Sequence, residues 1–119
     1  MTKKDYLDKV IGYNYDEKKL KIIHEMYSDQ LPEILEKIIS NSDEAVFFDD
    51  GTRILSYSEI LDAEKDLHIE FKDKGLIPIS DCGDNDFIVY DFINKIWAKF
   101  NIADEILFKK RSSLDELLS

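Results

Sequence analysis

The sequence predicts an α+β fold in a single domain, with N-terminal helices packed on a mainly antiparallel sheet and a short C-terminal helix. In the first forty residues, apolar side chains recur at spacings of three and four, which is typical of helices. From residue 45 onward they form short β-prone runs separated by turn signals. Helices and strands do not alternate, which favours α+β over a parallel α/β fold. A length of 119 residues suits one domain.

Three helices are expected before residue 42. The first covers residues 5–11, with Tyr6 and Val10 on its apolar stripe. Asp16 can cap the second, because its carboxylate can accept hydrogen bonds from the free N–H groups at a helix start. Pro32 opens the third, since a proline in the first turn loses no hydrogen bond there. The apolar faces of the second and third helices consist of Leu20, Ile23, Tyr27, Ile34, Leu35, Ile38 and Ile39.

Strands are expected at residues 45–48, 52–55, 76–79, 87–90, 95–100 and 105–108. Asp49-Asp50-Gly51 is a hairpin signal, because Asp-Gly readily adopts the positive φ of a tight turn. Pro78 donates no backbone hydrogen bond, so its strand is expected at a sheet edge, or the proline at a strand end.

Two further helices are short. Ser56 or Ser58 can cap the first of them. Ser56 and Glu59 also fit a capping box, in which each side chain accepts a hydrogen bond from the other residue's backbone. A helix is therefore expected to run from this point through Glu64. Ser112 or Ser113 can cap a terminal helix over residues 114–118.

The formal charge of −10 is unevenly distributed. Residues 1–24 hold six lysines and four acids, whereas residues 25–119 hold ten basic and 22 acidic residues. A polyanion such as DNA or RNA binds mainly through Lys and Arg, so the balance argues against a direct nucleic-acid partner and against an anionic membrane surface. Two interpretations stay open: a solvated surface that keeps the protein soluble, and an acidic face that docks a basic partner.

Neither disulfides nor targeting segments are expected. Cys82 is the one cysteine, so no internal disulfide can form. The first residues carry charge with no apolar run behind them, which does not fit a signal peptide. No stretch approaches the ~18 apolar residues of a membrane-spanning helix. A cytoplasmic location is the expectation.

The residues that could support catalysis are few. His24 begins a partial zinc-protease helix motif, but Ser28 stands where the second histidine should be. His68 is isolated in sequence, and acidic neighbours tend to raise the pKa of a thiol such as Cys82, which opposes thiolate chemistry. The sequence predicts no catalytic residue, no metal and no cofactor, and we expect no enzymatic activity.

Residues 81–86 (Asp-Cys-Gly-Asp-Asn-Asp) form the most distinctive polar stretch. Asp84 and Asp86 resemble part of a calcium-binding loop, but Phe87 follows where the EF-hand pattern needs glycine. A loop whose aspartates accept backbone hydrogen bonds is the favoured interpretation.

The order of motifs resembles the SUKH superfamily, which includes the yeast cell-wall-assembly-regulator domain and many bacterial immunity proteins. The likeness covers residues 31–118, from the Leu31-Pro32 helix start to the terminal Ser-Ser-Leu-Asp-Glu-Leu-Leu. Between them, Pro78, a Gly-Asp turn at Gly83 and a closing Asp91 fit the family pattern. One departure is at residues 41–43, Asn-Ser-Asp, where the family often has Asn-Gly-Gly.

The resemblance implies an immunity protein that binds a cognate polymorphic toxin in the cytoplasm and neutralises it by protein–protein contact. Such toxins include nucleases, whose substrate grooves tend to be basic. The residues expected to contribute to the partner-binding surface are Asp49, Asp50, Tyr57, Asp81, Asp84, Asp86 and Tyr90. The alternative is a regulatory or scaffold module, as the yeast relative suggests. A hydrolase using a metal at residues 81–86 is a third hypothesis, and the oligomeric state stays open.

Overall fold

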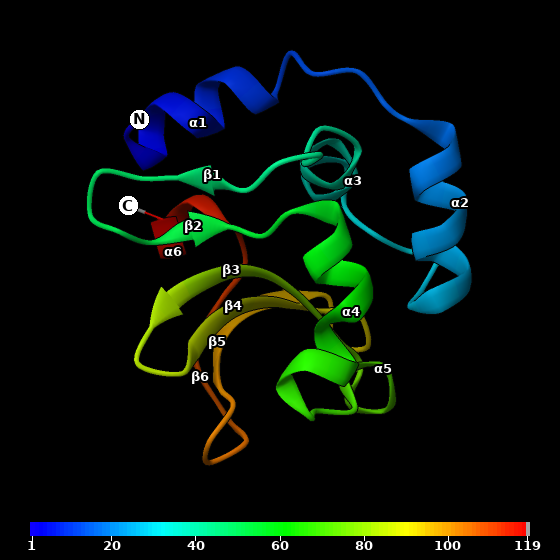
Figure 1. The fold of residues 1–119 in the computed structure, drawn as a ribbon, viewed down its shortest axis with the longest axis vertical. Coiled ribbons are helices and arrows are strands. Elements are labelled where there is room, and N and C mark those ends of the chain that lie inside the picture. Colours follow the sequence, from blue (N-terminus) through cyan, green and yellow to red (C-terminus); the bar gives the residue numbers. More distant parts are fainter. Residues whose placement is uncertain (119) are drawn as a thin grey trace.

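A computed structural model describes residues 1–118 and confirms the predicted α+β fold (Figure 1). Six antiparallel strands follow one another in the sheet in chain order, so each strand pairs with its neighbour in sequence. The Cα radius of gyration is 13.0 Å, close to the ~13.5 Å expected for one compact body of this length. The strands are β1 (Val46–Phe47), β2 (Arg53–Ile54), β3 (Leu76–Gly83), β4 (Asp86–Asp91), β5 (Ile96–Asn101) and β6 (Ile106–Arg111).

The predicted N-terminal helices are present with shifted bounds: α1 (Lys3–Val10), α2 (Glu17–Met26) and α3 (Glu33–Ser40). The Thr2 hydroxyl accepts a hydrogen bond from the backbone N–H of Asp5 and caps α1. Asp16 caps α2 as predicted, since its carboxylate accepts from two backbone N–H groups of the first turn. Pro32 stands immediately before α3 and makes no side-chain cap.

Helix α4 (Tyr57–Leu67) begins with the predicted capping box of Ser56 and Glu59 and runs longer than expected. It is followed by α5 (Phe71–Lys74), a single turn that the sequence did not predict. Gly75 ends α5 at a φ of 77°, and a Cβ there would lie 2.3 Å from the Cδ1 of Ile93. The positive φ therefore favours glycine at this position, whereas the exposed Ile93 side chain could move to relieve the steric contact.

Pro78 does not lie on an edge strand. Its strand, β3, has β2 on one side and β4 on the other. The proline is tolerated because β2 is short and pairs only with Ser80 and Asp81 of β3. At Pro78, β3 therefore has no partner strand on the side that faces β2. The expectation of an edge strand is wrong for β3 as a whole, but Pro78 itself lies at an unpaired stretch of it.

The predicted turns close two hairpins. Gly51, at a φ of 86°, completes the turn between β1 and β2. Asp84 and Asn85, at φ of 55° and 65°, form the two-residue turn between β3 and β4, the geometry that right-handed strand twist favours. Residues 81–86 are thus a strand end and hairpin turn, as the loop interpretation proposed.

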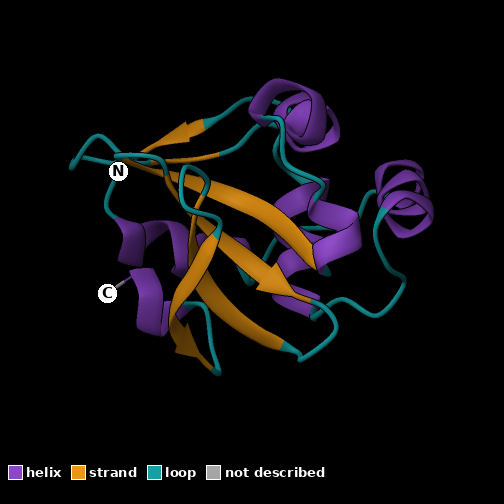
Figure 2. Cartoon of the chain, turned by 90° about the horizontal axis from the view of Figure 1, so that it is seen from below, coloured by secondary structure: helices purple, strands orange, loops and turns teal. Residues whose placement is uncertain are grey.

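Helices lie on both sides of the sheet (Figure 2). Helices α4 and α5 contact β3, whereas the terminal helix α6 (Asp115–Leu118) contacts β5, β6 and α1. Aromatic pairs join these layers: Tyr6 packs on Phe48, and Phe71 of α5 meets Phe100 of β5 edge to face. Within residues 1–118, no helix has the length and apolar composition needed to cross a bilayer.

Candidate functional site

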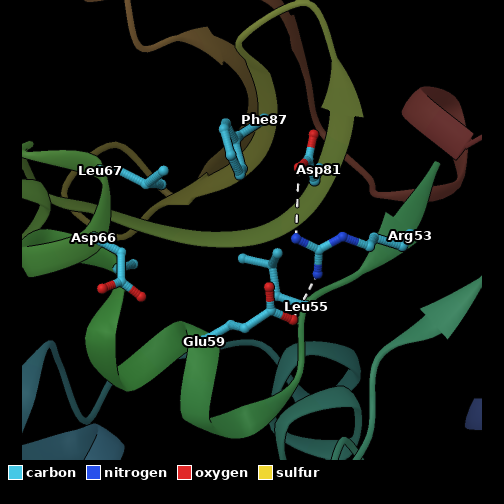
Figure 3. A pocket seen from close by; sticks show the side chains of 8 residues that line it. Arg53, Leu55, Glu59, Asp66, Leu67, Asp81 and Phe87 are labelled. Carbon is cyan, nitrogen blue, oxygen red and sulfur yellow. Dashed lines mark hydrogen bonds and ion pairs between the residues drawn. The ribbon is translucent and has the colours of Figure 1, made fainter.

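A small pocket opens between helix α4 and strands β2, β3 and β4 (Figure 3). The strand register creates one side of it, because Arg53 of β2 pairs with Asp81 of β3, and Asp81 pairs with Phe87 of β4. Side chains that are directly opposite in neighbouring strands share a face of the sheet. The pocket measures about 90 Å³ and is lined by Arg53, Leu55, Glu59, Ala63, Asp66, Leu67, Asp81 and Phe87.

Arg53 joins three elements at this pocket. Its Nη1 lies 2.6 Å from Glu59 Oε1 on α4, and its Nη2 lies 3.5 Å from Asp81 Oδ2 on β3. The same oxygen of Glu59 accepts a hydrogen bond from the backbone N–H of Ser56, at 3.0 Å. The capping box that starts α4 therefore also holds the ion pair in place.

The environment of Glu59 favours its charged form. Burial by itself would raise the pKa of the carboxyl, but hydrogen bonds from Arg53 and Ser56, with the guanidinium charge, outweigh it and lower the pKa. Glu59 is thus a carboxylate at neutral pH, engaged mainly with Arg53.

The carboxylates of the pocket outnumber its cation. Glu59, Asp66 and Asp81 face a single guanidinium, a formal charge of −2 over the lining residues. Asp66 is exposed near the end of α4, and within residues 1–118 no hydrogen bond or ion pair engages its carboxylate. Figure 3 shows it on the opposite side of the pocket from Arg53. The pocket therefore combines apolar walls with negative charge that the protein itself does not neutralise.

The structure places the other predicted acidic residues in different surroundings. Asp49 and Asp50 lie in the β1–β2 turn, where the Met1 amine is 2.8 Å from Asp49 and the Lys3 Nζ is 2.7 Å from Asp50. Hydrogen bonds from Lys3 and Thr52 hold the pKa of the Asp50 carboxyl well below its usual range. The negative charge of this turn is thus largely matched by neighbouring cations.

Asp84 and Asp86 lie at the β3–β4 hairpin. Asp84 is an exposed turn residue, and Asp86 Oδ1 accepts a hydrogen bond from Asn101 Nδ2 at 2.9 Å. The Asn101 amide also donates to the backbone carbonyl of Asp84, at 3.4 Å. These contacts give the two aspartates a role in fixing the hairpin, and neither lines the pocket.

The two predicted tyrosine anchors are packed within the molecule. Tyr90 is 6% exposed, and its ring lies 4.9 Å from that of Trp97. Tyr57 is half-buried at the start of α4, with the Lys19 ammonium 5.5 Å from its ring centre. Tyr90 in particular offers a partner almost no surface in this conformation.

Arg53, Asp66 and Phe87 line the pocket with Asp81 but were not among the residues predicted from the sequence, and Glu59 was predicted only as a capping residue. The capping-box motif was a signal for Glu59. The row from Arg53 to Phe87 depends on the register of two strand pairs, and that register depends on turn geometry as well as on the hydrophobic pattern.

His24 forms a contact between two helices, and Cys82 is a partly buried free thiol. His24 Nε2 lies 2.6 Å from Glu36 Oε2, which pairs α2 with α3. Burial raises the pKa of the Cys82 thiol, with neighbouring Asp81 adding a smaller effect in the same direction. Among residues 1–118, no group of three or more His, Cys, Asp or Glu side chains has an arrangement that could hold a metal ion.

Comparisons with protein-family models, with curated proteins and with solved structures give no match for this chain. The resemblance to the SUKH superfamily therefore stays a prediction from the sequence motifs.

Proposed function

We propose that this chain is an immunity protein of the SUKH type that binds a basic toxin domain in the cytoplasm and neutralises it by protein–protein contact, without catalysis. The observation that carries the proposal is the pocket beside α4, where three carboxylates surround apolar walls and only one guanidinium opposes them. Such a surface favours a cationic partner, and the charge of −10 over the whole chain adds long-range attraction.

The form of the surface also suits protein recognition. Interfaces commonly have an apolar centre and a polar rim, and the residues that contribute most lie where surrounding contacts exclude water. The pocket has that composition, with Leu55, Leu67 and Phe87 between the charged side chains. A nuclease is a suitable toxin class, because its substrate groove must attract a polyanion and would present basic residues to an acidic inhibitor.

Co-expression with the product of the neighbouring toxin gene tests the proposal. We expect the two chains to copurify as a complex and the host to survive toxin expression only when this chain is present. A toxin that kills in the presence of this chain, with no complex on size exclusion, would contradict it. A genomic locus with no toxin gene and a non-toxin partner would instead favour a regulatory or scaffold module.

A further inference from the structure

We infer that the pocket beside α4 receives one arginine side chain of the partner protein, with its guanidinium held by Asp66 and attracted by the net negative charge of the pocket. The inference rests on the proposed function in one respect, since it takes the partner to be a basic protein. It adds the place and the chemistry of the central contact.

The size of the pocket indicates a single side chain. Its volume of about 90 Å³ is well below the roughly 300–1,000 Å³ of pockets that enclose small organic ligands. One extended side chain from a docked protein surface fits such a hollow better than a free metabolite.

The charge of the pocket indicates a cation. Arg53 is engaged by Glu59 at 2.6 Å, whereas its contact with Asp81 is longer, at 3.5 Å. Asp81 therefore has acceptor capacity beyond the Arg53 contact, although its Oδ1 also accepts from the backbone N–H of Gly83. With Asp66 unpaired within residues 1–118, two carboxylates are available to an incoming positive group.

The apolar walls favour arginine over lysine. A long cationic side chain buries its methylene groups against apolar surface while its charged end reaches polar partners. Leu55, Leu67 and the ring of Phe87 supply that surface. A guanidinium also stacks on an aromatic ring and binds carboxylates with two hydrogen bonds, which an ammonium does not.

The test uses the whole chain and a defined probe, the capped peptide acetyl-Gly-Arg-Gly-amide, followed by amide chemical shifts in NMR. We expect saturable shifts at Leu55, Ala63, Leu67 and Phe87, with a dissociation constant on the order of 1–10 mM. The citrulline peptide, which has the same shape but no charge, should produce none of them. The lysine peptide should bind more weakly than the arginine peptide.

Two pairs of matched variants locate the contact. Asp66→Asn should weaken arginine-peptide binding about two- to fivefold, the range of an exposed ion pair, and Asp66→Lys should abolish it. Asp8 is an exposed aspartate of α1 that does not line the pocket, so Asp8→Asn and Asp8→Lys make the same charge changes elsewhere. Both Asp8 variants should bind the arginine peptide as the original chain does. Thermal unfolding of each variant confirms that it is folded.

Shifts that are absent, scattered over the acidic surface, shared by the citrulline peptide or unchanged by Asp66→Lys would overturn the inference. The same variants are then measured against the toxin. A toxin that binds the original chain and the Asp66→Lys variant equally well would overturn the arginine contact and leave the immunity function standing. Peptide binding at the pocket without any toxin binding would support a site for arginine and overturn the immunity function.

Discussion

The pocket beside α4 and the β1–β2 turn both present clustered aspartates, yet their electrostatics differ. In the turn, Asp49 and Asp50 each face one cation, the Met1 amine and the Lys3 ammonium. In the pocket, Glu59 and Asp81 pair with the one guanidinium of Arg53, and Asp66 has no partner within residues 1–118. A run of acidic residues in the sequence therefore does not by itself locate an acidic surface. What matters is how many cations the fold brings to each cluster.

The two regions also differ in what their ion pairs join. Arg53 connects β2, β3 and α4 and is half-buried, so its removal affects three elements. Lys3 and Asp50 connect the first helix to an exposed turn.

Arg53→Met should produce the largest loss of stability. The substitution keeps an apolar stem of similar length but leaves Glu59 and Asp81 without their guanidinium beside apolar walls. Leaving partly buried charges without a partner costs about 1–2 kcal/mol of unfolding free energy, reduced from the fully buried case by solvent exposure. Urea unfolding measures it, with Lys3→Met as the matched control. An equal loss in the two variants would show that the pocket pair is no more structural than the turn pair.

The association rate with a basic toxin should fall about tenfold between roughly 0.01 M and 0.15 M ionic strength, because the Debye length shortens from ~30 Å to ~8 Å. Asp66→Asn should make this dependence shallower, since it removes a charge that no cation of residues 1–118 pairs with. Asp50→Asn should change the slope less, because Asp50 lies outside the pocket. Stopped-flow association at a series of salt concentrations gives all three slopes. Identical slopes for the two variants would mean that both regions steer the partner equally.

Glu59→Gln should destabilise the protein in a pH-dependent way. The lowered pKa of Glu59 means that the folded state binds fewer protons than the unfolded state, so the carboxylate stabilises the fold above its ordinary pKa of about 4.3. This contribution is lost as the pH falls through the lowered folded value. At pH 7 the variant should be less stable by under about 1 kcal/mol, given partial exposure, and the difference should disappear in acid. Urea unfolding from pH 7 down to pH 3 checks this, and a constant difference would contradict it.

Local signals predicted most of the fold. The cap at Asp16, the capping box at Ser56 and the Asp-Gly hairpin turn each depend on residues close in sequence, and each is present. Helix α5 escaped prediction because four residues are too few to show a period. The edge position expected for the strand of Pro78 was wrong, because the length of the neighbouring strand β2 is not encoded near the proline.

The site could be predicted only in part, because it is assembled from segments far apart in sequence. Asp81 was among the expected residues, whereas Arg53 and Phe87 join it through two strand registers. Tyr90 was expected as an anchor for a partner protein. The sequence of its strand does not show which side chains other parts of the molecule cover. Its packing on Trp97 became evident only once both strands were in place.

Asp50→Asn should have the smallest effect of all. Asparagine keeps the Oδ1 acceptor that Thr52 uses through its N–H and hydroxyl, and Asn-Gly is as favourable a hairpin turn as Asp-Gly. Only the exposed contact with Lys3 is lost, so the urea midpoint should shift less than it does for Glu59→Gln. Toxin affinity should be nearly unchanged, because Asp50 does not line the pocket. An affinity loss as large as that of Asp66→Asn would show that the turn belongs to the binding surface, as the sequence alone predicted.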